Sequence, residues 1–303
     1  MTRVELSVGL SEAKLEAIAA LERRVVAHDG GRLKLEWGAL RLRPAEEVND
    51  LLCWSDTELV GFLGVYSFGW PTVELAGMVD PAYRRVGIAT DLVDGALRLL
   101  GDRRAERILM VVPRTAAGGG TELALGRGMV LDHSEHAMSL EQAMGSEHAM
   151  SLREPRHSTT TAVGRSAGMV QLRLATAGDL PELMRLLFDG FGPSSFDPAR
   201  ELADGRSRIL MASQAGEIVG TVRTTLDGER GGIYGLVVDS AHRGRGVGRE
   251  LLSRSCQELF STGASRVELE VAVENERALG LYTALGFERT ATEDYYELKF
   301  ADH

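Results

Sequence analysis

The sequence predicts an α/β (α+β) protein built from two tandem domains, each with a mixed, mostly antiparallel central sheet flanked by helices. The first observation is an apolar strand at residues 233–238, followed by alternating glycines and an amphipathic helix. The second is an alternating strand that begins at Val267 and precedes a helix starting near Asn275. The third is an internal repeat, because residues 80–92 align with residues 239–251.

The repeat extends over most of the chain. The motif Asp80-Pro-Ala-Tyr-Arg-Arg-Val-Gly-Ile-Ala aligns with Asp239-Ser-Ala-His-Arg-Gly-Arg-Gly-Val-Gly at an offset of 159 residues (239 − 80). Further along, Gly128 meets Gly286 at an offset of 158 (286 − 128). We therefore expect a tandem duplication of one domain, with one copy at residues 1–140 and the other at 170–303. The stretch 141–169, rich in Ser, Thr, Gly and charge, is interpreted as a linker.

Hydrophobic periodicity predicts the secondary structure of both copies. Ser11 is expected to cap the first helix of copy one, and Asp179 the first helix of copy two, with Pro181 in its first turn. In copy one the expected strands are 4–8, 51–54, 59–66, 73–79 and 108–112, and the helices are 11–28 and 88–100. In copy two the strands are 170–174, 208–212, 218–225, 233–238 and 293–300, and the helices are 179–191, a short one within 194–203, and 246–262.

The glycine loop of copy two has the composition of an anion-binding site. Gly244, Gly246 and Gly248 carry no Cβ, so backbone N–H groups can turn towards a bound anion. The first amides of the following helix lack intrahelical partners, and the helix dipole adds roughly half a positive charge there. Arg243 and Arg245 add fixed positive charge. A diphosphate group is the ligand that this loop favours.

Length and charge limit the classes of function. The 303 residues suggest about two domains, and no run of roughly 20 apolar residues could span a membrane. The first residues, Met-Thr-Arg-Val-Glu-Leu, lack the apolar core of a signal peptide, so a cytoplasmic protein is expected. The net charge of −10 opposes binding to nucleic acid or to anionic membranes, and it suits a cationic amine. The oligomeric state is left open.

Cysteine and histidine usage gives no indication of a disulfide framework or a metal site. Cys53 and Cys256 are the two cysteines and fall in different halves of the chain. His136 and His148 belong to a repeated seven-residue segment, Ser-Glu-His-Ala-Met-Ser-Leu, which begins at residue 134 and again at residue 146. No acidic or thiolate residue stands at metal-ligand spacing from these histidines, so the repeat is interpreted as a local duplication, and no metal is expected.

Two motifs in copy two resemble those of the GNAT superfamily of N-acetyltransferases. Arg243-x-x-Gly246-x-Gly248 resembles its acetyl-CoA pyrophosphate loop, and the order strand, Asn275, Ala, Leu-Tyr282, Leu-Gly-Phe resembles its second acetyl-CoA motif. The resemblance implies acetyl-CoA as cofactor, with strand 236–238 binding the pantetheine arm and Asn275 steadying it. The cofactor-binding residues so implied are Leu236, Val237, Val238, Arg243, Gly244, Arg245, Gly246, Val247, Gly248, Asn275 and Tyr282, and in copy one Met78, Val79, Arg84, Arg85, Val86, Gly87, Ile88 and Ala89.

Acetyl transfer to an amine requires a group that accepts the ammonium proton and a group that protonates the leaving thiolate. Glu270, on a strand before Asn275, is the candidate general base, with Glu268 and Glu274 in reserve. Tyr282 is the candidate general acid. The spacing of Glu270 and Tyr282 resembles that in the ribosomal-protein N-terminal acetyltransferases of the superfamily, where these positions act as base and acid. A splayed strand at 236–238 would also direct an amide at the thioester oxygen.

Copy one departs from this pattern at two positions. The 158-residue offset places Ala124 at the position of Tyr282 and Ala117 at the position of Asn275. The glycine loop persists as Arg84-x-x-Gly87-x-Ala89. Copy one therefore either binds acyl-CoA without turning it over or is purely structural, and the chemistry is assigned to copy two.

These features favour an acetyl-CoA-dependent N-acetyltransferase that acts on a primary amine of a small molecule. The alternatives are a protein or peptide N-terminal acetyltransferase, a mycothiol-synthase-like enzyme and a non-catalytic acyl-CoA-binding protein. The two-domain layout resembles mycothiol synthase and acetyltransferases of antibiotic biosynthesis. The segment 191–197, Phe-Gly-Pro-Ser-Ser-Phe-Asp, has no match in a mycothiol-synthase pattern.

Overall fold

The computed structural model describes residues 2–44, 46–69, 71–114, 119–142, 170–192, 196–205 and 207–299. Three features of the sequence analysis lie outside these residues: most of the predicted linker, Ala117, and the second copy of the repeated histidine-containing segment, which begins at residue 146. The chain forms two compact units: unit 1 consists of Met1–His136 and Thr290–His303, and unit 2 of Ala137–Arg289. Among the helices of the described residues, none has both the length and the apolar composition needed to cross a membrane.

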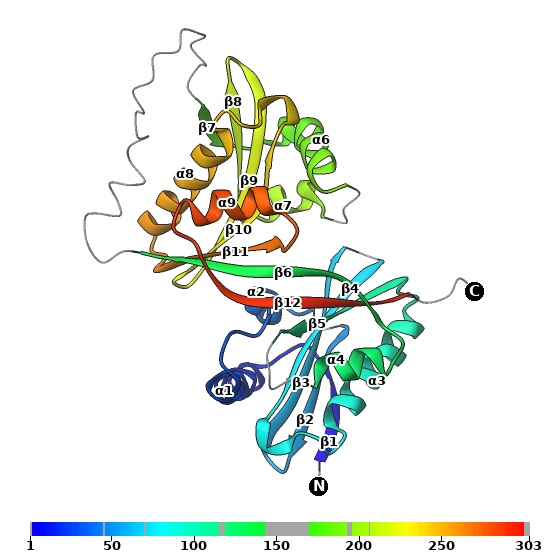
Figure 1. Cartoon of the computed structure of the whole chain (residues 1–303). Helices are drawn as coiled ribbons and strands as arrows, with labels where there is room; N and C mark the ends of the chain where they lie inside the picture. Colours follow the sequence, from blue (N-terminus) through cyan, green and yellow to red (C-terminus); the bar gives the residue numbers. More distant parts are fainter. Residues whose placement is uncertain are drawn as a thin grey trace. The chain divides into compact units, whose positions relative to one another are not determined.

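Unit 1 is a sheet covered by helices on both faces (Figure 1). Its strands lie in the order β1-β2-β3-β4-β5-β12, and neighbouring strands are antiparallel except for the parallel pair β4 and β5. Its elements are β1 (Thr2–Val8), α1 (Glu12–Asp29), α2 (Trp37–Arg41), β2 (Val48–Ser55), β3 (Glu58–Gly69), β4 (Thr72–Val79), η1 (Pro81–Tyr83), α3 (Ile88–Asp102), β5 (Arg107–Pro113), α4 (Gly120–Leu125), the start of β6 (Val130–Glu141) and most of β12 (Glu288–Lys299).

Two apolar clusters hold the layers of unit 1 together. Helices α1 and α2 pack on one face through Ile18, Leu21 and Leu40, all fully buried, with Phe62 from β3. Helix α3 packs on the other face through Leu92 and its neighbours. Because alternate strand residues point to opposite faces, both faces of the central strands are apolar and buried.

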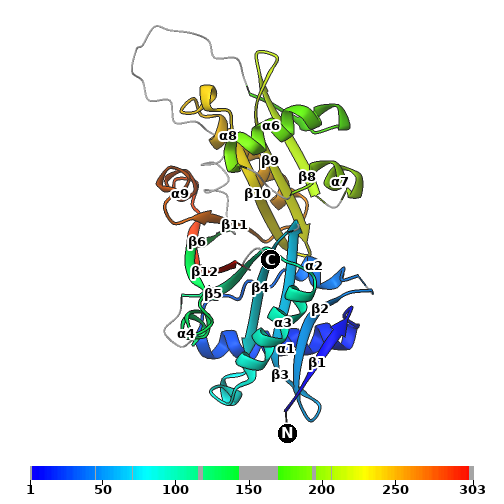
Figure 2. The ribbon, with the colours of Figure 1, turned by 90° about the vertical axis from the view of Figure 1, so that its right-hand side faces the viewer.

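Unit 2 repeats this arrangement. The strands β8, β9 and β10 lie side by side, with α7 on one side of them and α8 and α9 on the other (Figure 2). Its elements are the end of β6, β7 (Gln171–Leu174), η2 (Ala177–Asp179), α6 (Leu180–Phe191), α7 (Pro198–Asp204), β8 (Ser207–Gln214), β9 (Glu217–Asp227), β10 (Arg230–Val238), η3 (Ser240–His242), α8 (Val247–Ser261), β11 (Arg266–Ala272), α9 (Glu276–Thr283) and the start of β12. The parallel pair is β10 and β11.

The two copies exchange their last strands. The strand predicted at 293–300 exists as β12, but it pairs antiparallel with β5 of unit 1, where Tyr295 lies opposite Val111. In return, β6 continues from unit 1 into unit 2 next to β11, and its residues Met138 and Leu140 enter the core of unit 2. Each compact unit therefore contains one segment from the other half of the sequence. The boundaries 1–140 and 170–303 remain a prediction about the repeat.

Most predicted elements are present, and one predicted cap is wrong. Ser11 caps α1 as expected, since its hydroxyl accepts a hydrogen bond from the amide of Lys14. The side chain of Asp179 makes no cap to α6 within the described residues. It accepts hydrogen bonds from the Thr176 amide and from Arg173, because Thr176 begins a capping box one turn earlier.

Candidate functional site

The parallel strand of unit 2 contains a β-bulge. Tyr234 of β10 pairs with Arg223 of β9, but the next paired residue, Val237, lies opposite Thr221. Gly235 and Leu236 therefore face a single residue of β9, and Gly235 has a positive φ of 58°. The pairing of β10 with β11 covers Arg230–Gly232, beyond which the two strands separate. The bulge overlaps the start of the segment 236–238, where a splayed strand is predicted.

The glycine loop follows this strand directly. Asp239 caps the short helix η3, and the Arg243 Nε donates a hydrogen bond to the Val238 carbonyl over 2.9 Å. Gly244 and Gly246 have φ values of 76° and 86°, a region that favours glycine. Gly246 begins α8, and within that helix the first amide that bonds back to it is the amide of Glu250.

The N-terminus of α8 can bind an anion. The amides of Val247, Gly248 and Arg249 precede the first intrahelical hydrogen bond, and no side chain of the described residues caps this end. The arginines of the loop are exposed. A Cβ built on Gly244 or Gly246 would meet no described atom within 4 Å, so open space adjoins the loop. This geometry fits a diphosphate group.

Asn275 and Tyr282 stand at the two ends of α9. The Asn275 Oδ1 accepts a hydrogen bond from the amide of Ala278 over 3.1 Å, so this side chain caps the helix. Tyr282 is 8% exposed and packs beside Phe287, with 6.0 Å between ring centroids. Burial raises the pKa of the Tyr282 hydroxyl to about 12. The hydroxyl therefore keeps its proton at neutral pH.

The candidate bases lie on and after β11. Val267, Leu269 and Val271 point into the core beneath α8, so Glu268 and Glu270 lie on the opposite face of the sheet. Glu268 forms an ion pair with Arg266 at 2.9 Å, and Glu270 is half-buried. Glu274 is exposed in the turn before α9. Glu270 and Tyr282 thus come from consecutive elements, β11 and α9.

Sequence reasoning missed a group of residues on the same face as Glu270. The guanidinium of Arg223 lies against the rings of Phe196 and Tyr234, with its carbon 4.9 Å and 4.4 Å from their centroids. Glu201 of α7 accepts a hydrogen bond from Arg223. The alternation of strand residues places Arg223 on the face opposite Val222, but it cannot identify the aromatic partners, which come from two other segments of the chain.

The loop of unit 1 has the same backbone but a different charge balance. Gly87 begins α3 with a φ of 97°, and the Arg84 Nε donates to the Val79 carbonyl over 3.1 Å. Both terminal nitrogens of Arg84 also bond the carboxylate of Asp29, at 2.9 and 2.6 Å. The Arg84 guanidinium holds the pKa of Asp29 below its usual range. The charge of Arg84 is therefore already neutralised within the unit.

Unit 1 also lacks the bulge and the tyrosine. Strands β3 and β4 pair without a register shift from Gly61 opposite Val79 to Tyr66 opposite Glu74. Ala124 occupies in α4 the position that Tyr282 occupies in α9. The Ala124 carbonyl accepts a hydrogen bond from the amide of Met129, and the Tyr282 carbonyl accepts one from the amide of Phe287. In both cases the donating residue follows a glycine with positive φ. Ala124 is fully buried in the core of unit 1.

The face that carries Glu268 and Glu270 in unit 2 is filled with apolar side chains in unit 1. Because Glu74 pairs with Leu109 as Gly232 pairs with Glu268, the residues corresponding to Glu268 and Glu270 are Leu109 and Val111. They are 5% and 6% exposed and pack against the α1–α2 layer. At these two positions unit 2 therefore has carboxylates where unit 1 has buried apolar side chains.

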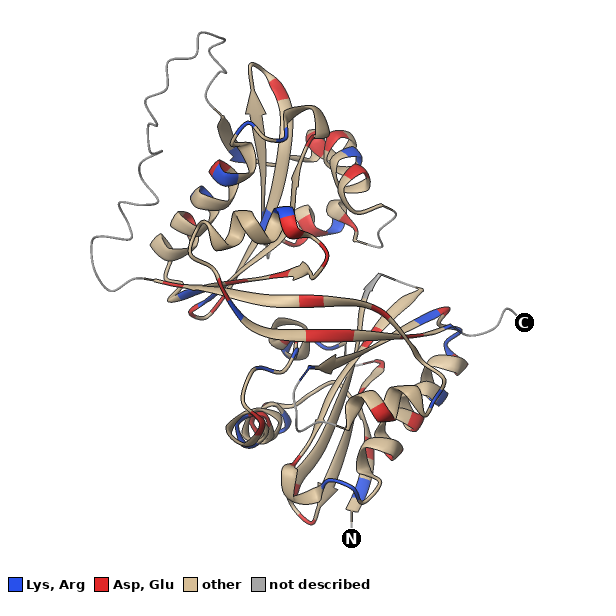
Figure 3. Cartoon of the chain, viewed as in Figure 1, with Lys and Arg blue, Asp and Glu red and all other residues tan. Residues whose placement is uncertain are grey.

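Charged groups gather elsewhere in unit 1. Acidic side chains recur along β6 and β12 (Figure 3), where Tyr295 donates a hydrogen bond to Glu135 and itself accepts one from Lys34. His133 stacks on Tyr295 at 4.2 Å, and His136 bonds Thr292. These histidines serve the packing of neighbouring strands, whereas His148 lies outside the described residues.

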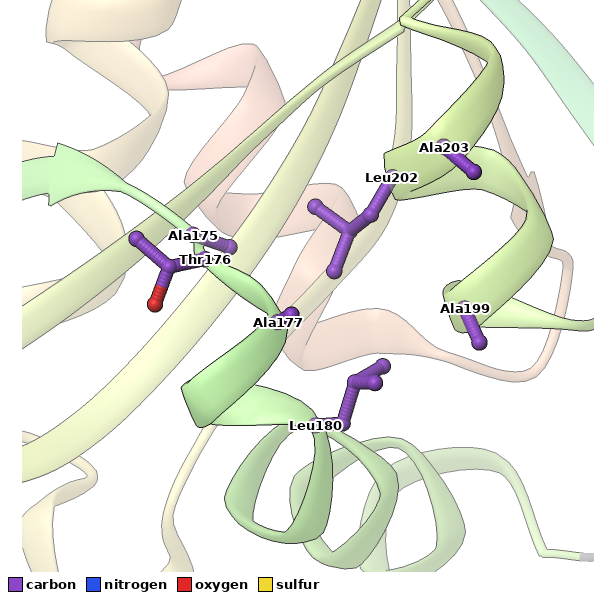
Figure 4. A pocket seen from close by; sticks show the side chains of 7 residues that line it. All are labelled: Ala175, Thr176, Ala177, Leu180, Ala199, Leu202 and Ala203. Atoms are coloured by element: carbon purple, nitrogen blue, oxygen red, sulfur yellow. The ribbon is translucent and has the colours of Figure 1, made fainter.

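One surface pocket lies in unit 2 between the start of α6 and α7 (Figure 4). Its lining consists of small or apolar residues: Ala175, Thr176, Ala177, Leu180, Ala199, Leu202 and Ala203. Because none of these side chains ionises near neutral pH, the pocket offers no acid or base for acetyl transfer.

The fold and site define a tandem α/β protein with a glycine loop before a helix in each unit and a bulged parallel strand in one. The sequence profile of the Acetyltransferase (GNAT) family matches residues 16–118 and 179–287. The chain belongs to this family and is an acetyltransferase with two GNAT domains in tandem. Members of the family generally use acetyl-CoA.

Solved structures share the fold over the whole chain. A GCN5-related N-acetyltransferase from Sphaerobacter thermophilus superposes with a TM-score of 0.74 at 20% identity, covering 98% of this chain and 95% of that one. A tandem GNAT protein from the clavulanic acid biosynthesis pathway gives a TM-score of 0.70 at 17% identity, with both chains fully covered. At these identities the likeness confirms the predicted fold class.

Proposed function

We propose that the chain is an acetyl-CoA-dependent N-acetyltransferase that transfers the acetyl group directly to a primary amine of a small molecule in unit 2. The observation that carries the proposal is the combination, within one unit, of the bulge at Gly235, the open helix end at Gly246 and the protonated Tyr282. Unit 1 shares the loop and lacks the other two features.

The α8 loop supports binding of the diphosphate of acetyl-CoA. The amides of Val247, Gly248 and Arg249 are available to phosphate oxygens, and Arg243 and Arg245 supply charge. The backbone of Leu236, Val237 and Val238 would bind the pantetheine arm, since β10 has left β11 at this point. Asn275 would keep the start of α9 in place through its cap.

The proton steps are assigned to Glu270 and Tyr282. Bound acetyl-CoA supplies an acyl thioester, which an uncharged amine can attack. Glu270 accepts the proton of the acceptor ammonium, directly or through water. Tyr282 donates its phenolic proton to the departing sulfur, and its pKa of about 12 keeps the donating form populated over the physiological range. A backbone amide at the bulge stabilises charge on the carbonyl oxygen.

Unit 1 is proposed to be non-catalytic. Its glycine loop keeps the backbone conformation of the loop in unit 2; the residues concerned are Met78, Val79 and Arg84 to Ala89. However, Asp29 neutralises Arg84, and Arg85 adopts a positive φ of 64° where unit 2 has Gly244. A strained non-glycine residue and a paired arginine both weaken the case for tight diphosphate binding there.

The test measures coenzyme A release and acetylated product with a panel of primary amines. Tyr282→Phe is expected to lower kcat about 10- to 100-fold with little change in acetyl-CoA affinity. Tyr296→Phe is the matched control, because Tyr296 is a tyrosine of unit 1 with similar burial, 7% against 8% exposed. A preference for peptide N-termini would change the acceptor class. Acetyl-CoA binding without any acetylated product would make the chain a binding protein.

A further inference from the structure

Arg223 of β9 lies on the face of the unit 2 sheet that carries Glu270. The carbon of its guanidinium is 4.9 Å from the ring centroid of Phe196 and 4.4 Å from that of Tyr234. Contact with two aromatic rings holds the charged group at this place on the sheet. N–H groups that these contacts do not use can bind a ligand.

The edge of this guanidinium is incompletely used. Its Nη1 donates to the Glu201 carboxylate over 3.1 Å. Within the part of the chain that the structure describes, Nε and Nη2 of Arg223 have no hydrogen-bond acceptor. The Arg223 side chain remains 25% exposed, so a ligand can reach it. Planar pairs of guanidinium N–H groups are suited to a carboxylate.

Arg223 belongs to a row of three functional side chains that crosses the sheet. Arg223 of β9 pairs directly with Tyr234 of β10. The parallel register, Gly232 beside Glu268, places Glu270 at the level of Tyr234 on β11. All three side chains lie on the face opposite α8, because their neighbours Val222, Ile233 and Leu269 enter the core beneath that helix. The row thus contains a cation, an aromatic ring and a carboxylate.

We propose that the acceptor is a small zwitterion, an amino acid or a similar primary amine with a carboxylate, and that Arg223 binds its carboxylate. This inference rests on the proposed function, in which Glu270 receives the ammonium end. Adjacent paired strands are about 4.8 Å apart, and β11 has left β10 at this level, so the backbones of Arg223 and Glu270 are separated by more than two strand spacings, roughly 10 Å or more. Their side chains can therefore engage the two ends of a molecule of amino-acid size.

The other unit supports a role beyond packing. The register places Gly64 where Arg223 stands and Ala76 where Tyr234 stands, since Gly64 pairs with Ala76. Leu109 and Val111 replace the two glutamates of β11 in unit 1. At the positions that correspond to Arg223, Tyr234, Glu268 and Glu270, unit 1 therefore has neither a cation, an aromatic ring nor a carboxylate.

The experiment compares matched acceptors, each an amino acid with its decarboxylated amine, using the full chain. Wild type is expected to favour the carboxylated member by about 10-fold or more in kcat/KM. Arg223→Gln should lower kcat/KM for that member by about 10- to 100-fold and change the decarboxylated member by less than about 3-fold. Arg208→Gln is the control, an arginine of β8 paired with Glu258.

A structural role for Arg223 predicts a different outcome. If Arg223 acts by holding α7, then Glu201→Gln and Arg223→Gln will reduce both members of each pair equally, and the inference is overturned. If it binds the acceptor, Glu201→Gln will leave the preference intact, because the guanidinium edge stays available. Calorimetry adds a readout independent of turnover: the N-acetylated amino acid should bind to the wild type with coenzyme A and not to Arg223→Gln.

The result separates the two proposals. Acetylation of amines without a preference for the carboxylated member overturns the zwitterion inference and leaves the proposed function in place. Failure to acetylate any amine of the panel overturns both.

Discussion

Units 1 and 2 share a loop and differ in what surrounds it. Gly87 and Gly246 both begin a helix with positive φ, and Arg84 and Arg243 both bond the carbonyl that ends the preceding strand. Around this common element, unit 2 has a bulge, a buried tyrosine and a polar sheet face. Unit 1 has a regular strand, an alanine and an apolar core.

This difference separates binding architecture from chemistry. The loop geometry follows from backbone conformation, which glycine at the helix start is enough to permit. The proposed chemistry requires carboxylates on the opposite face, and unit 1 has Leu109 and Val111 at the corresponding positions, where both pack in the cluster around Phe62. A glycine loop in a duplicated domain therefore identifies ancestry more securely than it identifies a working site.

The largest expected effect tests the core of unit 1. Tyr295 of β12 is 1% exposed and packs in the α1–α2 layer. Tyr295→Ala should lower the free energy of unfolding of unit 1 by about 3–5 kcal/mol, because it leaves a large cavity. Differential scanning calorimetry would record this loss. Tyr295→Phe, which keeps the ring, is the control, and an equal loss with both variants would assign the effect to the hydroxyl.

The next largest effect concerns the glycine loops of the two units. Gly246→Val should weaken acetyl-CoA binding by about 100-fold or more, because a β-branched residue cannot adopt a positive φ without strain and its side chain would enter the ligand space. Gly87→Val, at the matching position, should leave turnover unchanged. Titration calorimetry that counts sites in both variants checks this. Loss of the single site with Gly87→Val would reverse the assignment of the catalytic unit.

A smaller effect concerns the base. Glu270→Gln should lower kcat about 10-fold and flatten the alkaline rise of the pH–rate profile, since an amide accepts no proton from the acceptor. The profile of Glu268→Gln should keep its shape, because Glu268 is paired with Arg266. Tyr282 does not contribute a limb below pH 10, given its pKa of about 12. An unaltered profile in Glu270→Gln would identify another base.

The smallest effect is a pH dependence of stability in unit 1. Burial raises the pKa of Asp50 to about 6, although its partner Arg43 lies 3.0 Å away. A raised carboxyl pKa means that the folded state binds the proton more tightly, so this group lowers stability as the pH rises from about 4 to 6. From pH 7 to pH 5 wild type should gain about 1 kcal/mol relative to Asp50→Asn. Urea unfolding at both pH values measures this difference, and a constant difference would contradict it.

Much of the fold could be predicted from local patterns. The neighbouring strands 208–212 and 218–225 and the cap at Ser11 depend on local sequence and are present as expected. The helix that starts at Gly246 follows from the same kind of signal. The exchange of β6 and β12 could not be predicted, because a strand's sequence specifies its faces and not its partner.

The site was predictable where backbone chemistry dominates and not where distant segments meet. The residues of the glycine loop follow one another in the chain, so a sequence motif reveals them. The bulge at Gly235 changes the offset between the two strands from 158 to 159 (230 − 72 and 238 − 79), a change that the strand bounds of the structure reveal and that no sequence motif marks. The contacts of Arg223 with Phe196 and Tyr234 also have no sequence signal, since only the folded chain brings these three residues together.

The strand exchange sets an order for folding during synthesis. The strand that unit 2 takes from the first half of the chain, β6, is translated before the rest of that unit. Unit 1 cannot complete its sheet at that stage, because β12 emerges from the ribosome only after all of unit 2 up to Arg289 has been made. Until then β5 presents an open edge beside apolar Val111, an exposed template for pairing with other nascent chains. Unit 1 is thus the last to complete its sheet.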